Sequence, residues 1–307
     1  MRVSTAYLAV TSPDPMDIAE ILRHILIVLI AAKVAAEVAE RVGIPAVVGE
    51  IVAGIAIGPS LLNIVGSGGG DDVLRTLGEL GVILLLLDVG LEMDLRELGR
   101  VGRTSFQVAT VGVVAPLVLG IVAMQAMGND FTTSLFVGAA LTATSVGITA
   151  RVFGDLKALA TTEARIVLGA AVADDVMGLV VLTVVVRLVA DGSVSVLSVA
   201  GIVAVAVLFL VLGGLGGLRL GPPLFALIER VSRSSGTMVA LALAFTLAFA
   251  ELADAARLAP IVGAFVAGIA LSKSRQADQI RRELLPVGHL FIPVFFLQIG
   301  IDADVDA

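Results

Sequence analysis

The chain lacks cysteine altogether and is poor in aromatic and charged residues. It has 307 residues with no Cys, no Trp and one Tyr, and Asp, Glu, Lys and Arg together make up only 15% of them. Without cysteine the chain can form neither a disulfide bond nor a thiolate metal site. Because Trp and Tyr are so scarce, the aromatic belts that often flank membrane spans give little guidance here.

What the chain has in abundance is apolar residues, arranged in long runs. Hydrophobic residues make up 58% of the chain, and the mean hydropathy is +1.06. A soluble domain of this size does not need so much apolar surface, whereas a membrane-spanning helix needs about 20 consecutive apolar residues. Such runs also exclude a transmembrane β-barrel, whose strands alternate over about ten residues. We therefore predict an all-α polytopic membrane protein.

Ten apolar segments are predicted to cross the membrane. Several are short or interrupted by Gly and Pro, as expected where helices are discontinuous around a binding site. The segments are residues 18–39, 46–62, 74–91, 105–126, 132–153, 165–188, 195–217, 237–253, 259–272 and 287–301.

Lys and Arg are distributed unevenly among the connections between these segments. One set of alternate connections holds 14 of the 20 basic residues, and the other set, with the N-terminal segment, holds four. The remaining two, Lys33 and Arg187, lie within spans. Because cytoplasmic loops carry the excess of Lys and Arg, the richer set is predicted to be cytoplasmic and the N-terminus to be outside.

Two stretches of the chain occur twice, in the same order. "VGEIVAGIAIG" at 48–58 matches "VGAFVAGIALS" at 262–272 in seven of eleven positions, and "VGLEMDL" at 89–95 is similar to "IGIDADV" at 299–305. The offsets, 214 and 210 residues, nearly agree. By the predicted orientation the two copies enter the membrane from opposite sides. Inverted repeats with a site at their interface are typical of secondary transporters.

The repeat also predicts how the chain is organised. We expect residues 1–307 to form a single transmembrane transporter domain, with a first repeat at about 44–190, connecting spans at about 195–254 and the start of a second repeat at about 259–307. Three spans follow the repeated stretches in the first copy, and none follows them in the second. We therefore expect a complete protein of thirteen spans, of which this chain carries about ten.

Two adjacent carboxylates, Asp174 and Asp175, lie within the apolar stretch "AAVADDVMGLVVL". A single charge at this depth costs about 2.5–3.5 kcal/mol on insertion scales, so polar pairs there usually have a function. Successive helical residues point about 100° apart, so the two side chains need not face the same partner. Because removal from water and mutual repulsion both favour the protonated carboxyl, such a group can hold either a proton or a metal cation. That competition is the minimal chemistry of an antiporter; the alternative is a pair neutralised by basic neighbours that fixes helix packing.

The preceding span, "FVGAALTATSVGITARVFGDL", contains the hydroxyl residues Thr142, Thr144 and Ser145. Hydroxyl groups and glycine permit local unwinding, which releases backbone carbonyls as cation ligands. We predict an unwound cation path here, close to the Asp pair. The alternative is ordinary helix packing through small residues.

Two further carboxylates are candidates for an accessory role. Glu50 lies inside the second span, where it is either part of the ion path or a packing carboxylate with a partner. Asp88 lies inside the third, either as a second ionisable group along the path or as a partner of Lys33 or Arg187. The residue pattern leaves these alternatives open.

The sequence contains no phosphate-binding loop, dinucleotide fingerprint or nucleophile elbow. We therefore expect neither an enzyme nor ATP-driven transport, no nucleotide or nucleic-acid partner, and no cofactor beyond the transported ions.

Several stretches together resemble one family. They are "PAVVGEIVAGIAIGPSLL", "LGVILLLLDVGLEMDL", "LTATSVGITARVFGDL", "RIVLGAAVADDVMGLVVL" and "LAPIVGAFVAGIALS", and they resemble the bacterial sodium/proton exchanger domain of the monovalent cation:proton antiporter-2 family, most of all its electrogenic NapA-type members. The resemblance runs from about Ala31 to Val305. It implies an inverted-repeat antiporter fold in a bacterial inner membrane, a homodimer, and exchange of Na+ or Li+ for protons by elevator-type alternating access.

The resemblance also implies roles for individual residues. Asp175 matches the carboxylate that binds the cation and carries a proton, Asp174 the one that pairs with a membrane lysine, and Thr144 and Ser145 fall in the unwound segment. Potassium-efflux relatives usually lack the double Asp, which favours Na+ or Li+.

The chain departs from the family pattern in two ways. The lysine partner is expected beyond Ala307, and Asp88 stands where the family usually has an apolar residue. Potassium/proton antiport, a non-transporting sensor and an inactive fragment therefore remain as alternatives.

Overall fold

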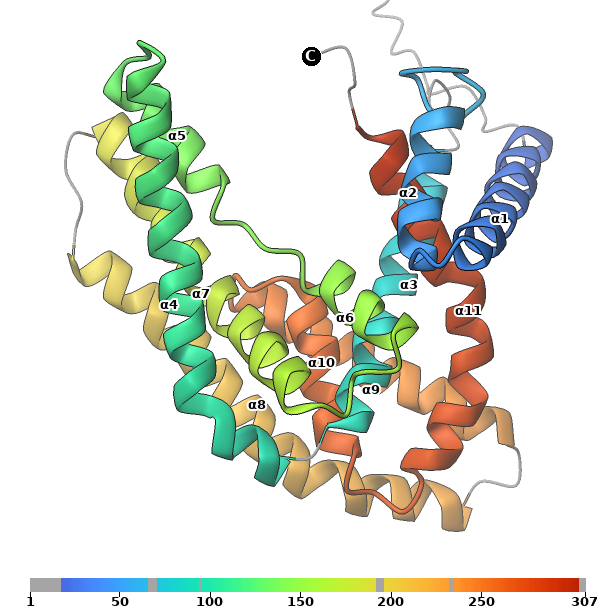
Figure 1. The fold of residues 1–307 in the computed structure, drawn as a ribbon. Helices are drawn as coiled ribbons and strands as arrows, with labels where there is room; N and C mark the ends of the chain where they lie inside the picture. Colours follow the sequence, from blue (N-terminus) through green and yellow to red (C-terminus); the bar gives the residue numbers. More distant parts are fainter. Residues whose placement is uncertain (1–17, 66–70, 94, 192–195, 232–234, 304–307) are drawn as a thin grey trace, which may run out of the picture. The chain divides into compact units, whose positions relative to one another are not determined.

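The computed structural model describes residues 18–65, 71–93, 95–191, 196–231 and 235–303, and every regular element within them is an α-helix (Figure 1). The helices, in chain order, are α1 (Ile18–Arg41), α2 (Ala46–Ile57), α3 (Asp71–Glu92), α4 (Leu95–Ala126), α5 (Phe131–Ala140), α6 (Val146–Asp155), α7 (Thr162–Asp191), α8 (Val196–Val231), α9 (Ser235–Ala255), α10 (Pro260–Leu271) and α11 (Ala277–Ile301).

The helices follow the predicted spans, with three informative differences. The segment predicted at 132–153 is two helices, α5 and α6, separated by residues 141–145, so the prediction of a discontinuous helix is confirmed. α8 continues to Val231, well beyond the predicted end at 217, through Pro222 and Pro223. α11 begins at Ala277 and α4 at Leu95, each ten residues before the predicted start, because the charged stretches "ADQIRRELL" and "LRELGRVGRT" are also helical.

Four of the described helices are long and apolar enough to cross a bilayer, judged by length and composition. They cover Arg100–Ala126, Val199–Val231, Gly236–Ala255 and Ala277–Ile301. α2, α5 and α10 are shorter apolar helices. The chain is therefore a multi-pass membrane protein, as predicted.

The chain divides into two compact units. The first comprises residues up to Gly78 and from Pro293 onward, with α1, α2 and one end each of α3 and α11. Its buried core contains Val28, Ala32, Val65, Leu74, Val294, Leu297 and Ile301. Arg75 pairs with Asp302 at 3.2 Å at its edge.

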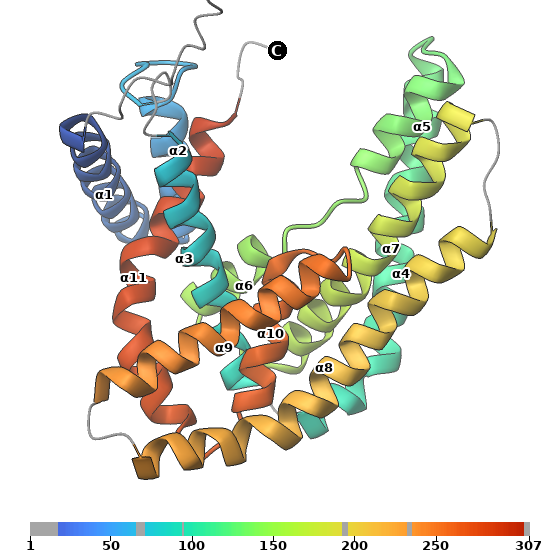
Figure 2. The same cartoon turned by 180° about the vertical axis from the view of Figure 1, so that it is seen from behind.

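The second unit, Glu79–Ile292, holds the remaining helices and is built around α10. Every residue of α10 from Val262 to Leu271 is buried, and the helix packs against α8 and α9 (Figure 2). α7 packs against α4, α5 and α6 in the same unit. The predicted domain boundaries themselves stay a prediction.

Two contacts between glycines show that the repeat found in the sequence is also present in the structure. A methyl group added at Gly54 of α2 would lie 2.9 Å from the Cα atom of Gly300 in α11, and one added at Gly268 of α10 would lie 2.8 Å from that of Gly90 in α3. Gly54 and Gly268 are 214 residues apart, and Gly90 and Gly300 are 210 apart. The same two offsets relate the repeated stretches, so each helix contact is the counterpart of the other.

The second helices of the two copies, α3 and α11, run in opposite directions. In the second unit, Gly81 lies against Phe291, Leu84 faces Gly288 and Asp88 bonds Arg281, so positions rise along α3 as they fall along α11. Antiparallel counterparts make the repeat inverted, as the orientation of the spans predicted. The last residues of the second copy, 304 and 305, lie outside the described residues.

Candidate functional site

The break between α5 and α6 is formed by hydroxyl residues that satisfy the ends of both helices. The Thr142 hydroxyl donates to the Ala139 carbonyl at 2.8 Å, at the end of α5. Ser145 caps α6, where its hydroxyl accepts the Ile148 N–H at 3.3 Å. Helix ends leave backbone groups without partners, and Ser and Thr side chains supply them. This is the physical reason that the chain unwinds at this point.

Asp174 lies beside this break. It is on α7 with only 8% of its surface exposed, and it lies close to the Thr144 side chain, whose hydroxyl donates to the Thr142 carbonyl at 3.3 Å. Its Oδ1 atom has no hydrogen-bond partner among the described residues. The fold therefore brings Asp174 to the unwound segment, although α6, a short connection and the first three turns of α7 separate them in the sequence.

Asp175 faces a different element. Its Oδ2 atom accepts the backbone N–H of Ala259 at 3.2 Å, and Ala259 is the residue that precedes the first turn of α10. The N-terminus of a helix carries a partial positive charge that favours a nearby carboxylate. The pair thus connects α7 to the α5–α6 break through one side chain and to α10 through the other.

Other predicted site residues lie apart from this arrangement. Glu50 is fully buried, at 0% exposure, on the inner face of α2. It belongs to the first unit, whereas the Asp pair belongs to the second. Its role as an accessory ion ligand therefore stays a prediction.

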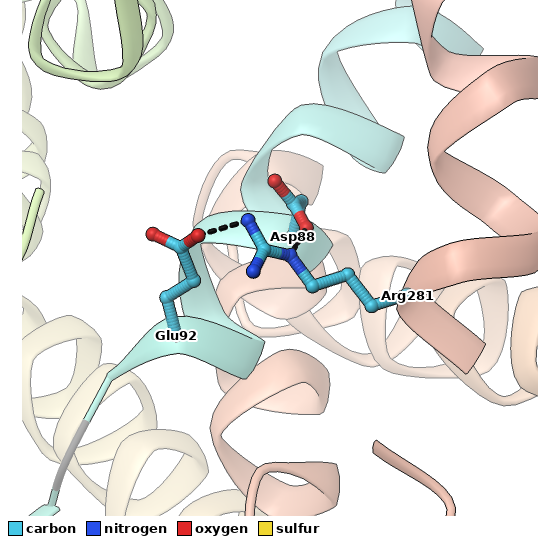
Figure 3. A network of polar contacts seen from close by, with 3 residues as sticks. All are labelled: Asp88, Glu92 and Arg281. Atoms are coloured by element: carbon cyan, nitrogen blue, oxygen red, sulfur yellow. Dashed lines mark hydrogen bonds and ion pairs between the residues drawn. The ribbon is translucent and has the colours of Figure 1, made fainter. Parts of the chain in front are cut away.

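Asp88 has a partner that the sequence did not suggest (Figure 3). Its Oδ1 atom accepts a hydrogen bond from Arg281 Nε at 2.7 Å, and Glu92 forms an ion pair with the same guanidinium. The two proposed partners of Asp88, Lys33 and Arg187, were both wrong. Arg281 lies before 287, the predicted start of the last span, but this stretch is helical in the structure and carries Arg281 alongside α3.

We call Asp88, Glu92 and Arg281 the Arg281 cluster. It lines a cavity of about 460 Å³ formed by α3, α6, the turn after α6 and α11. A second ion pair, Arg151 to Asp155 at 3.2 Å, lies on the α6 side of the same cavity. Acidic and basic side chains both line this cavity, and Asp88, Glu92 and Asp155 each pair with an arginine.

The sequence of this chain is similar to that of one family of known proteins. The model of the family described as sodium/hydrogen exchanger, transmembrane, matches residues 25–307. The chain belongs to this exchanger family. The matched residues include the broken helix, the Asp pair and both repeated stretches.

Two curated exchanger relatives illustrate the similarity. The high-affinity Na(+)/H(+) antiporter NhaS3 of Synechocystis sp. is 33% identical over 336 residues, covering 99% of this chain and 72% of the relative. The Na(+)/H(+)-K(+) antiporter GerN of Bacillus cereus is 32% identical over 288 residues, covering 94% of this chain and 73% of the relative.

A solved exchanger structure has the same fold. The sodium proton antiporter MjNhaP1 from Methanocaldococcus jannaschii, at pH 8, superposes with a TM-score of 0.61 and 19% identity, covering 94% of this chain and 72% of that one. The predicted fold class, an all-α antiporter fold with discontinuous helices, is thereby confirmed.

Proposed function

We propose that this chain carries out secondary active exchange of Na+ or Li+ for protons across the membrane. Membership of the exchanger family and the relatives NhaS3 and GerN, described as Na(+)/H(+) and Na(+)/H(+)-K(+) antiporters, support the reaction. The observation that carries the proposal is the position of Asp174 beside the Thr144 segment, with Asp175 next to it on the same helix. Asp174 lies beside the unwound segment, and Asp175, the next residue on α7, lies against the start of α10. A carboxylate shielded from water in this way can hold an alkali ion or a proton, and not both.

In this proposal Asp175 is the exchanging group. Its carboxylate binds the cation after losing its proton, and rebinding of a proton releases the cation. Thr142, Thr144 and Ser145 contribute hydroxyl and carbonyl oxygens, the ligand type that replaces the hydration shell of an alkali ion. Asp174 holds the unwound segment against α7. The cation is the substrate, and no resident cofactor is needed.

The setting of this reaction is also part of the proposal. The excess of Lys and Arg on one set of connections supports an N-terminus outside a bacterial inner membrane. The inverted repeat supports alternating access, in the elevator form implied by the resemblance. An exposed apolar stripe on α1, with Leu22, Leu26 and Ile30 more than half exposed, is available for lipid or for the second subunit of a homodimer.

The test measures transport in everted membrane vesicles that hold a proton gradient. The fluorescence of a pH-sensitive dye is quenched by this gradient, and its recovery is measured after Na+, Li+ or K+ is added. We expect wild-type protein to dissipate the proton gradient on addition of Na+ or Li+, and Asp175→Asn to abolish this response. Asp254→Asn, the same change at an exposed position near the end of α9, is the matched control and should transport normally. Undiminished exchange by Asp175→Asn would refute the assignment of this residue.

One relative favours a second candidate, potassium/proton antiport. GerN is described as a Na(+)/H(+)-K(+) antiporter. This candidate predicts a dye response to K+ that exceeds the response to Na+ in the same vesicles. A correctly folded protein that gives no response to any of the three cations would instead support a non-transporting sensor or an inactive fragment.

A further inference from the structure

α8 is too long to be only a membrane span. It has 36 residues, from Val196 to Val231, and at about 1.5 Å per residue it extends about 54 Å, against about 30 Å of hydrocarbon in a bilayer. Pro222 and Pro223 lie within it, and Figures 1 and 2 show it bending along its length. The first two thirds of α8 are enough to span the membrane, so the last third needs another explanation.

One face of this last third, residues 220–231, is packed against protein. Phe225 is 0% exposed and belongs to a buried cluster with Met238, Leu271 and Ile280. Gly221 lies against Ala270 and Leu271 at the end of α10. The segment is therefore a fixed part of the second unit.

A second face is apolar and exposed. Leu220, Leu224, Leu227 and Val231 are 68%, 43%, 58% and 74% exposed. Their spacings of four, three and four residues place them in a single stripe along the helix. Such a stripe on a membrane protein is stable only in contact with lipid or with another protein.

A third face is basic. Arg219 and Arg230, both exposed, project on one side of the helix, roughly a right angle away from the apolar stripe at about 100° per residue. Glu229 accepts a hydrogen bond from Gln276 Nε2 at 2.5 Å, which ties the segment to the turn before α11. That turn carries two more exposed basic residues, Lys273 and Arg275.

We propose that residues 220–231 lie in the plane of the membrane at its cytoplasmic surface and bind anionic lipid. The stripe of Leu220, Leu224, Leu227 and Val231 enters the acyl chains, while Arg219, Arg230, Lys273 and Arg275 meet the phosphates of anionic headgroups. Amphipathic helices with apolar and basic faces take this orientation, and each basic residue adds to the attraction for an anionic leaflet. The proposal depends on membrane insertion and not on the proposed transport reaction.

The orientation can be measured directly because the chain contains no cysteine. Single cysteines at the four stripe positions are labelled with a fluorophore, and their depth is measured by quenching with spin-labelled lipids in phosphatidylcholine vesicles containing about one quarter phosphatidylglycerol. We expect four equal, shallow depths. Val205→Cys and Leu212→Cys, at exposed positions earlier in α8, are the controls and should lie deeper.

Two results would overturn the in-plane orientation. A spanning helix changes depth by about 1.5 Å per residue, so Leu220 and Val231 would differ by about 16 Å. A segment standing in water would instead be quenched by aqueous iodide as strongly as a labelled loop residue. Both measurements are independent of cation transport.

The lipid partner is tested separately with purified protein in detergent. We expect phosphatidylglycerol to raise the Tm more than phosphatidylcholine does, and an Arg219→Gln/Arg230→Gln variant to lose about half or more of that difference. An Arg23→Gln/Arg257→Gln variant removes the same amount of positive charge from the side predicted to face outward. This variant should keep the difference in Tm between the two lipids. An equal effect of the two lipids, or an unchanged difference in the first variant, would overturn the anionic-lipid contact.

Discussion

Asp174 and Asp175 are adjacent in the chain but lie against different elements. Asp174 lies close to Thr144 in the unwound segment, and Asp175 accepts the N–H of Ala259 at the start of α10. The Thr144 hydroxyl donates to the Thr142 carbonyl at 3.3 Å within this segment, and such a hydrogen bond contributes about 0.5–1.5 kcal/mol. The contribution of the Thr144 hydroxyl to cation binding can be measured by substituting valine, which has nearly the same side-chain shape.

We predict that Thr144→Val raises the Na+ concentration needed for half-maximal exchange by about tenfold, because it removes the hydroxyl without changing the side-chain volume. The measurement is a Na+ titration in everted vesicles. Thr110→Val on α4 is the control, since its hydroxyl donates to the Phe106 carbonyl within a regular helix, away from the unwound segment. Equal titration curves for wild type and Thr144→Val would contradict a role for this hydroxyl.

The Arg281 cluster sets two carboxylates against one guanidinium. Asp88 is 17% exposed, Glu92 28% and Arg281 39%. Removing one carboxylate leaves a matched pair, whereas removing the cation leaves two like charges close together. The effects of substitution should therefore be unequal.

We predict that Asp88→Leu lowers the free energy of unfolding by less than about 1 kcal/mol, and that Arg281→Met lowers it by about 2–4 kcal/mol. The measurement is denaturation of purified protein in mixed micelles. Arg282→Met, at the exposed neighbouring position, controls for the loss of charge alone. A larger effect from Asp88→Leu than from Arg281→Met would show that the cluster is not held together by Arg281.

At the level of the helices, the two glycine contacts make the inverted repeat testable. Gly54 meets Gly300 where α2 packs on α11, and Gly268 meets Gly90 where α10 packs on α3. Interfaces between membrane helices depend on small residues that let the backbones approach closely. An added methyl group has no room at either contact, because the opposing atoms are backbone and not flexible side chains.

We predict that Gly54→Ala and Gly268→Ala each destabilise the protein by about 1–3 kcal/mol, and by similar amounts, because the two contacts are counterparts. Gly112→Ala on α4, where nothing lies within 4 Å of the added methyl, should be neutral or slightly stabilising. The measurement is thermal unfolding in detergent. Tolerance of both substitutions would contradict the close helix contacts.

For the molecule as a whole, the orientation in the membrane is predicted from the distribution of Lys and Arg among the connections. This prediction can be tested with single cysteine substitutions. The chain contains no cysteine, so single cysteines report without background. We predict that Asn63→Cys, between α2 and α3, reacts with a membrane-impermeant thiol reagent added outside intact cells, and that Lys157→Cys, after α6, does not. Both positions are exposed. The reverse pattern of labelling would invert the proposed topology.

The order and class of the helices, the break at residues 141–145 and the family were all accessible from the residue pattern. Apolar runs, basic connections and hydroxyl or glycine residues act over a few turns of chain, so their positions along the sequence carry the information. The inverted repeat was also accessible, because two stretches of sequence preserve it. The prediction failed first at helix ends, where the charged start of α11 and the end of α8 beyond Pro223 do not look like membrane spans.

Contacts between helices that are far apart in the sequence could not be predicted from the residue pattern and were decided by the packing of the fold. Asp175 bonds a residue 84 positions away, and Asp88 bonds one 193 positions away. Hydrophobic periodicity indicates which face of a helix is buried, but not which of several arginines will lie opposite a given carboxylate. That depends on how far each helix extends and on where two backbones cross, and these are set by close packing among residues that no local pattern connects.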